Sequence, residues 1–134
     1  MSPVQTPAGA AVRTLADPDT PFAVVDVHKV RRNVERLAAR AERLGVTLRP
    51  HVKTAKSLDV AALLHAGDRP CPVTVSTMAE AEAFADGGYS DITYAVGIDP
   101  HKLPRVVALL RRGVTLLDEI MERHPVLRSE VVPA

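Results

Sequence analysis

Pro72-Val-Thr-Val-Ser-Thr-Met-Ala-Glu80 joins a predicted strand to a predicted helix with no loop between them. The apolar, β-branched run from Pro72 to Ser76 is typical of a buried strand. Thr77 and Glu80 have the spacing of a capping box, in which side chain and backbone satisfy each other at the start of a helix. The pair Gly87-Gly88 ends that helix. This stretch therefore predicts one strand–helix unit.

The same unit recurs on both sides of this stretch. Strands are expected at 22–26, 46–52, 91–96 and 114–117, and helices at 27–44, 57–66 and 99–112. Asp26, Ser57 and Asp99 precede these helices and can cap them by accepting backbone N–H bonds. Pro104 fits poorly inside the last helix, so its regular part has an alternative start near Pro104.

The alternation of strand and helix, at intervals of roughly 20 to 25 residues, predicts the fold class. It requires parallel strands joined by right-handed crossovers, which is an α/β arrangement. Two architectures have this order: an open doubly wound sheet and part of a (β/α)8 barrel of the TIM type. Periodicity alone does not distinguish them.

The composition describes a globular chain of ordinary domain size with little net charge. Of its 134 residues, 46% are hydrophobic and 25% are charged, and the formal net charge is +1. That balance argues against nucleic acid as a partner. With two Phe, two Tyr and no Trp, the core depends on Ala, Val and Leu, as in helices packed on buried parallel strands.

Several other classes of protein are disfavoured. The single cysteine, Cys71, excludes an internal disulfide, and neither it nor the five histidines have metal-ligand spacing. Residues 1–20 lack a basic start followed by an apolar core, and no apolar run approaches the ~20 residues that span a bilayer. We therefore expect a cytoplasmic protein with no membrane partner.

The helix expected at 27–44 has one apolar face and one basic face. A basic amphipathic helix can contact a membrane or RNA. Glu35 and Glu42 interrupt the basic stripe, however. This pattern fits better the solvent-facing side of a helix on which acidic and basic side chains pair.

The stretch Arg49-Pro-His-Val-Lys-Thr-Ala-Lys56 carries the candidate chemistry. It ends a predicted strand and precedes a predicted helix, and α/β folds bind ligands at the carboxyl ends of parallel strands. A neutral lysine amine at that edge can attack an aldehyde to form a Schiff base, which is how pyridoxal phosphate (PLP) is held. Lys53 and Lys56 both have this position, although most lysines are solvated surface groups.

Four segments, taken in order, resemble one enzyme family. They are Thr20-Pro-Phe-Ala-Val-Val-Asp26, Asn33 in the helix that follows, Arg49-Pro-His-Val-Lys-Thr-Ala-Lys56, and Thr74-Val-Ser-Thr-Met-Ala-Glu-Ala-Glu82. Together they resemble the N-terminal part of D-threonine aldolase and D-serine dehydratase-like enzymes, which belong to the alanine racemase-like, fold type III class of PLP enzymes. The resemblance runs from about Thr20 to about Leu116.

This resemblance implies a fold and a site. The fold would be a (β/α)8 barrel with an added β domain, and 22–26 would belong with the β domain. Lys53 matches the lysine that holds PLP. His51 and Arg49 would bind the cofactor region as neighbours that tune it by charge and hydrogen bonding, and Thr54 would help to shape the turn. Relatives often have His where this chain has Ala55, so one polar contact is expected to be missing.

The length fits only part of such a barrel, which needs about 200 to 250 residues. We expect a loose arm at 1–20, the N-terminal half of the barrel at 21–117 and a divergent tail at 118–134. The later groups of the family, including its divalent-cation site, have no counterpart here. The expectation is a truncated chain, inactive alone, whose partner is a missing C-terminal half or a second copy.

The function that the resemblance implies is a PLP-dependent lyase for D-amino acids that carry a β-hydroxyl. Such an enzyme takes a small amino acid as substrate and acts by elimination or by retro-aldol cleavage. Two alternatives stay open. One is an amino-acid racemase of the same class, and the other is a non-catalytic remnant that binds PLP or self-associates through open strand edges.

Overall fold

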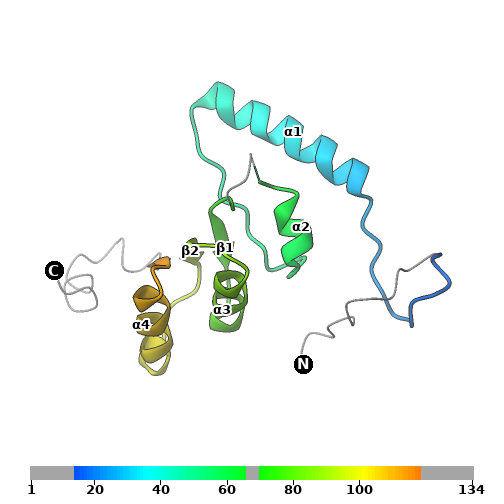
Figure 1. The fold of residues 1–134 in the computed structure, drawn as a ribbon. Coiled ribbons are helices and arrows are strands. Elements are labelled where there is room, and N and C mark those ends of the chain that lie inside the picture. The colour runs from blue at the N-terminus through cyan, green and yellow to red at the C-terminus, as the bar shows by residue number, and fades with distance from the viewer. Residues whose placement is uncertain (1–13, 66–69, 119–134) are drawn as a thin grey trace.

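The computed structural model describes residues 14–65 and 70–118 of the chain (Figure 1). In chain order the elements are α1 (Val27–Leu44), α2 (Leu58–Ala62), β1 (Val73–Val75), α3 (Met78–Asp86), β2 (Asp91–Tyr94), the 3-10 helix η1 (Pro100–Lys102), α4 (Leu103–Arg111) and β3 (Thr115–Asp118). From β1 to β3 the predicted alternation of strand and helix is confirmed.

The strands form a parallel sheet in the order β1-β2-β3. Residues 50–52 extend this sheet beside β1, because Thr74 N donates to Pro50 O at 2.8 Å and Val52 N donates to Thr74 O at 2.9 Å. His51 and Thr74 form an isolated parallel bridge at this point. The predicted fold class, α/β with a parallel sheet, is confirmed in this coarse form.

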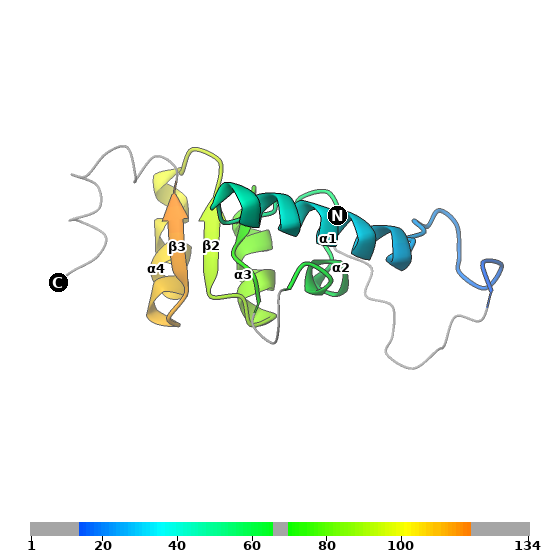
Figure 2. The same cartoon turned by 90° about the horizontal axis from the view of Figure 1, so that it is seen from above.

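Helices α3 and α4 cover one face of the sheet (Figures 1 and 2). The strand residues on this covered face are almost fully buried: Val73, Val75, Ile92 and Tyr94. The helices contribute Met78, Ala81, Phe84, Val106 and Leu109 to the same core. Removing these apolar side chains from water is the main force that holds the two layers together.

The opposite face of the sheet, which we call the open face, is polar and is not covered by α3 or α4. The strand register places Thr74 and Thr93 side by side on it, and both are partly exposed. Thr115 of β3 lies on the same face and is exposed. Helix α1 lies on this side of the sheet, away from α3 and α4 (Figure 1), and Ala41 is its buried residue.

Each predicted helix start is confirmed by a side chain that accepts a backbone N–H. The pairs are Asp26 with Lys29 N (2.9 Å), Ser57 with Val60 N (3.3 Å), Thr77 with Glu80 N (3.1 Å) and Asp99 with His101 N (2.8 Å). These bonds satisfy backbone donors that the helix itself leaves free. Gly45, with a φ of 63°, ends α1 in the left-handed conformation that favours glycine.

One predicted strand was wrong, and another was wrong in part. Residues 22–26 form no strand, since no segment of the described chain lies beside them to exchange backbone hydrogen bonds. Of the strand predicted at 46–52, only residues 50–52 exchange backbone hydrogen bonds with β1, through the bridge at His51.

One helix prediction needed correction, because the helix predicted at 57–66 ends at Ala62. For the last helix the alternative start near Pro104 is confirmed: Asp99 caps a 3-10 turn, and the regular helix α4 begins at Leu103. Pro104 thus falls in the first turn of α4, where a residue without an N–H is tolerated.

The predicted arm and tail lie largely outside the described residues. The arm at 1–20 is described only from residue 14, and Asp118 is the sole residue of the tail that is described, as the last residue of β3. Among the helices of 14–65 and 70–118, none is both long and apolar enough to cross a bilayer.

Candidate active site

Lys53 lies in the turn that directly follows residues 50–52, at the carboxyl end of the parallel sheet. Lys56 N closes this turn by donating to Val52 O at 2.9 Å. Lys53 N donates to the ring Nδ1 of His51 at 3.3 Å. The structure confirms the predicted position of Lys53 at a strand end, which is where parallel α/β folds bind ligands.

The amine of Lys53 has no side-chain partner within the described residues, unlike the amines of the other lysines. The other three lysines have partners: Lys29 Nζ lies 3.5 Å from Asp26 Oδ2, Lys56 Nζ lies 3.0 Å from Glu80 Oε1, and Lys102 Nζ lies 3.0 Å from Tyr94 Oη. Within the described residues, Lys53 Nζ has neither an ion-pair partner nor a hydrogen bond, and the residue is exposed. Lys53 therefore presents an accessible amine that is not engaged by the protein.

Glu80 is a buried carboxylate that reaches this turn, with a relative exposure of 7%. Its Oε2 accepts hydrogen bonds from Ser76 N at 2.8 Å and from Ser76 Oγ at 3.1 Å. Its Oε1 forms the ion pair with Lys56 but receives no directed hydrogen bond within the described chain. Burial raises the pKa of Glu80, but the hydrogen bonds from Ser76 and the charge of Lys56 outweigh burial and hold that pKa below its ordinary value.

Only one of the two hydrogen bonds of the predicted capping box between Thr77 and Glu80 is present. Thr77 Oγ1 does accept from Glu80 N, as the capping box requires. The Glu80 side chain, however, accepts from Ser76 and pairs with Lys56. The sequence did not predict the contact between Glu80 and Lys56, because it joins two segments that no local pattern connects.

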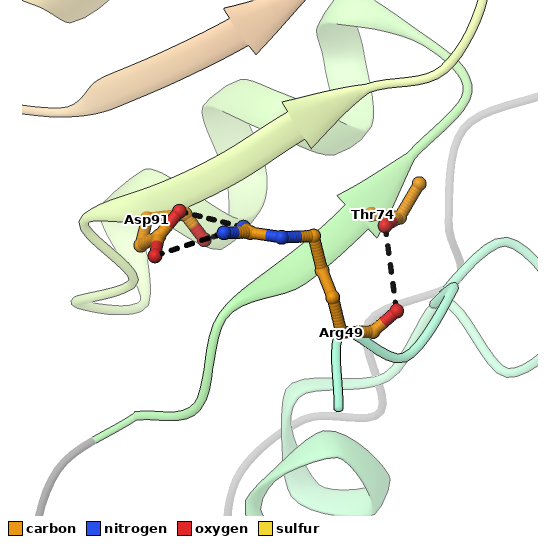
Figure 3. A network of polar contacts seen from close by, with 3 residues as sticks. All are labelled: Arg49, Thr74 and Asp91. Carbon is orange, nitrogen blue, oxygen red and sulfur yellow. Dashed lines mark hydrogen bonds and ion pairs between the residues drawn. The ribbon is translucent and has the colours of Figure 1, made fainter. Parts of the chain in front are cut away.

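Arg49 lies just before residues 50–52, at the end away from Lys53, and its side chain is bound by Asp91. Its guanidinium donates to both carboxylate oxygens of Asp91, at 2.6 and 3.1 Å, and its carbonyl oxygen accepts from Thr74 Oγ1 at 3.5 Å (Figure 3). Asp91 is the first residue of β2. The structure thus brings Arg49 together with Asp91, four positions before the turn that carries Lys53, and its predicted role beside the cofactor stays a prediction.

His51 and Thr54 lie next to Lys53 in the chain. Because His51 Nδ1 accepts from Lys53 N, the ring proton of neutral His51 lies on Nε2. The bridge with Thr74 places His51 on the open face of the sheet. Thr54 is exposed within the turn. Their predicted roles near a cofactor stay predictions.

The other polar pairs lie away from this turn. Arg105 donates to Glu82 at 2.6 and 2.7 Å, and Arg112 donates to Asp86 at 2.6 Å, so these pairs join α3 to α4.

Burial raises the pKa of the Cys71 thiol, against a smaller opposing effect of a backbone hydrogen bond. In the described ranges no three His, Cys, Asp or Glu side chains are grouped as metal ligands would be.

Comparison with known proteins identifies relatives of this chain. No family model matches it. It is 48% identical over 103 residues to D-threo-3-hydroxyaspartate dehydratase of Delftia sp. (strain HT23), covering 77% of this chain and 27% of that enzyme. It is 32% identical over 98 residues to 3-hydroxy-D-aspartate aldolase of Paracoccus denitrificans, and 33% identical over 102 residues to D-serine dehydratase of Schizosaccharomyces pombe. Each of these covers 72% of this chain, and 25% and 24% of the relative.

Two solved structures agree with these sequence matches. A mutant of D-threo-3-hydroxyaspartate dehydratase superposes with a TM-score of 0.69 at 49% identity, covering 77% of this chain and 26% of that one. An alanine racemase-like protein from Idiomarina loihiensis superposes with a TM-score of 0.70 at 46% identity, covering 84% of this chain and 31% of that one.

The chain is homologous to the D-serine dehydratase family. The predicted resemblance is thereby confirmed, and the named homologues are D-amino-acid lyases, both dehydratases and an aldolase. The chain spans about a quarter of the length of the curated D-serine dehydratase relatives it matches. It corresponds to a segment of them.

Proposed function

We propose that this chain is the cofactor-lysine segment of a PLP-dependent lyase that acts on D-amino acids carrying a β-hydroxyl, with Lys53 as the residue that holds PLP. The homologues support the substrate class, because D-serine and 3-hydroxyaspartate, in their names, both have a hydroxyl on Cβ. The names include both dehydratases and an aldolase, so the proposal covers loss of water and retro-aldol cleavage.

The observation that carries the proposal is the free amine of Lys53. A lysine that holds an aldehyde cofactor needs an amine that no other side chain already engages. Within the described residues only Lys53 meets this condition, since the other lysines pair with Asp26, Glu80 and Tyr94. Its position at the carboxyl end of a parallel sheet also fits a cofactor site.

The residues around Lys53 fit a cofactor of this kind. PLP, when bound, supplies an electron sink for a bond that breaks at the substrate Cα. Lys53 would hold the cofactor and, when its amine is free, would move a proton at Cα. His51 would orient the start of the turn through its bond to Lys53 N. Arg49 and Thr54 are proposed as further neighbours of the cofactor region.

The same proposal extends to the architecture. Residues 21–117 would form the N-terminal part of a (β/α)8 barrel, and the open face with Thr74, Thr93 and Thr115 would line its interior. Parallel strands covered on one side by α3 and α4 support this arrangement. The likeness to an alanine racemase-like protein also supports it. No metal is assigned to this segment, and a divalent cation would belong to other parts of the family's fold.

A non-catalytic, self-associating chain is a second candidate. Large apolar side chains are exposed along α1 and on the segments that flank it: Phe22, Val24, Val25, Val27, Leu37, Leu44 and Val46. Exposed apolar surface of this kind favours association. Racemisation is a third candidate, on the likeness to the alanine racemase-like protein alone.

A PLP titration of the purified chain tests the proposal. We expect a visible absorption band that Lys53→Ala abolishes and that Lys29→Ala leaves intact. A band that survives Lys53→Ala, or that Lys29→Ala removes equally, contradicts the assignment of Lys53. A chain that elutes as an oligomer and never takes up PLP favours the non-catalytic candidate.

A further inference from the structure

The turn that carries Lys53 is held at its far end in an unusual backbone conformation. Lys56 has a φ of 47°, which places a residue with a side chain in the left-handed region. Such residues are uncommon and persist where surrounding contacts fix them. The contacts here are the bond from Lys56 N to Val52 O and the ion pair from Lys56 Nζ to Glu80.

Glu80 is itself fixed by a different part of the fold. Its N–H is bonded to the cap of α3, and its Oε2 accepts two hydrogen bonds from Ser76, the residue after β1. With 7% of its surface exposed, the carboxylate has little freedom to move. Its second oxygen, Oε1, is directed at Lys56, at 3.0 Å. The junction of β1 and α3 therefore provides a rigid anchor for the neighbouring turn.

We propose that Glu80 is a positioning residue for Lys53: by holding Lys56, it fixes the turn and keeps the Lys53 amine at the strand ends. This inference rests on the proposed function for the role of Lys53. The ion pair has a second consequence, because it engages the Lys56 amine. An amine held by a carboxylate is less accessible to an aldehyde than the unengaged amine of Lys53, so Glu80 also directs the aldehyde to Lys53 and away from Lys56.

Four variants separate this role from a general effect on folding. Glu80→Gln removes the charge and keeps the shape. Lys56→Asn removes the ion pair but tolerates the left-handed conformation, while Lys56→Arg retains the pair. Glu82→Gln is the matched control, because Glu82 lies on the same helix and pairs with Arg105, away from the turn.

The first readout is the site of labelling when the chain is treated with PLP, reduced with borohydride and mapped by peptide mass spectrometry. We expect the ratio of label at Lys53 to label at Lys29 to fall by about tenfold in Glu80→Gln and Lys56→Asn, within the loss that a small displacement of a reacting group produces. Label at Lys56 should rise in Glu80→Gln. Lys56→Arg and Glu82→Gln should label as the unchanged chain does. A ratio that none of the four variants alters overturns the inference and leaves the proposed function standing.

The second readout does not depend on PLP. Hydrogen exchange of the Lys56 amide reports the closing bond of the turn, and we expect faster exchange in Glu80→Gln than in Glu82→Gln. Should the unchanged chain show no preference for Lys53 over Lys29, the proposed function fails, and exchange still decides the inference. Equal exchange of the Lys56 amide in both Glu variants and in the unchanged chain would refute the positioning role.

Discussion

The Arg49 guanidinium and the Asp91 carboxylate form two parallel hydrogen bonds, at 2.6 and 3.1 Å, between strands that are not neighbours in the sheet (Figure 3). Arg49 precedes the bridge beside β1, whereas Asp91 begins β2 on the other side of β1. The backbone ladder between residues 50–52 and β1 is short. This side-chain pair therefore adds a second tie between the lysine-bearing strand and the sheet.

Breaking this pair should loosen that strand. Arg49→Met is expected to lower the free energy of unfolding by about 1 kcal/mol, the upper range for a partly exposed pair. Arg49→Lys should lower it by less, because lysine keeps the charge but cannot form the two-pronged contact. Urea denaturation at low and high salt measures both effects, which should shrink as salt increases.

A double-mutant cycle with Asp91→Asn tests whether the effect belongs to the pair. If the contact accounts for the loss, Arg49→Met should cost little in a chain that already carries Asp91→Asn. Additive losses would assign the stability to separate interactions of each residue.

Lys53→Ala should leave stability unchanged within about 0.5 kcal/mol, as expected for an exposed side chain without partners. Within the described residues no contact of its amine would be lost. Thermal unfolding of Lys53→Ala beside Lys56→Asn provides the comparison, since Lys56 does have a partner in Glu80. A clear drop in melting temperature for Lys53→Ala would show that the amine has a structural role after all.

The fold could be predicted from the sequence wherever the signal was local. Helix starts depend on one side chain and a backbone N–H three residues away or fewer, so Asp26, Ser57 and Thr77 were recognised as caps. The strands β1, β2 and β3 were predicted because their apolar runs are flanked by turns. The segment 22–26 has the same kind of run but no paired neighbour, and a strand exists only where another segment exchanges hydrogen bonds with it.

The site was predictable only in part, and for the same reason. Lys53 stands in a stretch that resembles a known family, and its place after a strand follows from the strand–helix order. The partners of Lys56 and Arg49 depend on how distant segments meet in space: Arg49 and Asp91 are 42 residues apart in the chain. No spacing rule connects such residues, so Glu80 was seen as a cap and Asp91 as the start of a strand.

Thr77→Ala should lower the free energy of unfolding by about 1 kcal/mol, the typical cost of losing a capping side chain. The Thr77 hydroxyl accepts from Glu80 N at 3.1 Å, and alanine leaves that backbone donor without a protein partner. Thr54→Ala is the matched control, because Thr54 is exposed in a turn. Denaturation of the two variants gives the comparison, and equal losses would mean that the cap contributes nothing beyond the threonine itself.

Acid should weaken the chain in part through Glu80. The pKa of Glu80 in the folded chain lies below its ordinary value of 4.5, so the unfolded chain takes up the proton first as pH falls. The stability that this carboxylate contributes is therefore complete above 4.5 and is lost as pH falls through the lower, folded pKa. Glu80→Gln has no such proton to take up. We expect it to be less stable than the unchanged chain near neutral pH, with a difference that shrinks steadily as pH falls below 4.5.

Glu82 provides the internal comparison for this pH dependence. Its hydrogen bond from Arg105 lowers its pKa too, against a smaller opposing effect of burial. Glu82→Gln should therefore also lose less stability in acid than the unchanged chain does. Glu80 connects α3 to the turn that carries Lys53, whereas Glu82 connects α3 to α4. Because the two carboxylates share no partner, their contributions to stability should add in the double variant. If the gap between Glu80→Gln and the unchanged chain stays constant from neutral pH into acid, the stabilisation by Glu80 does not depend on its charge, and the ion pair with Lys56 is not what holds the turn.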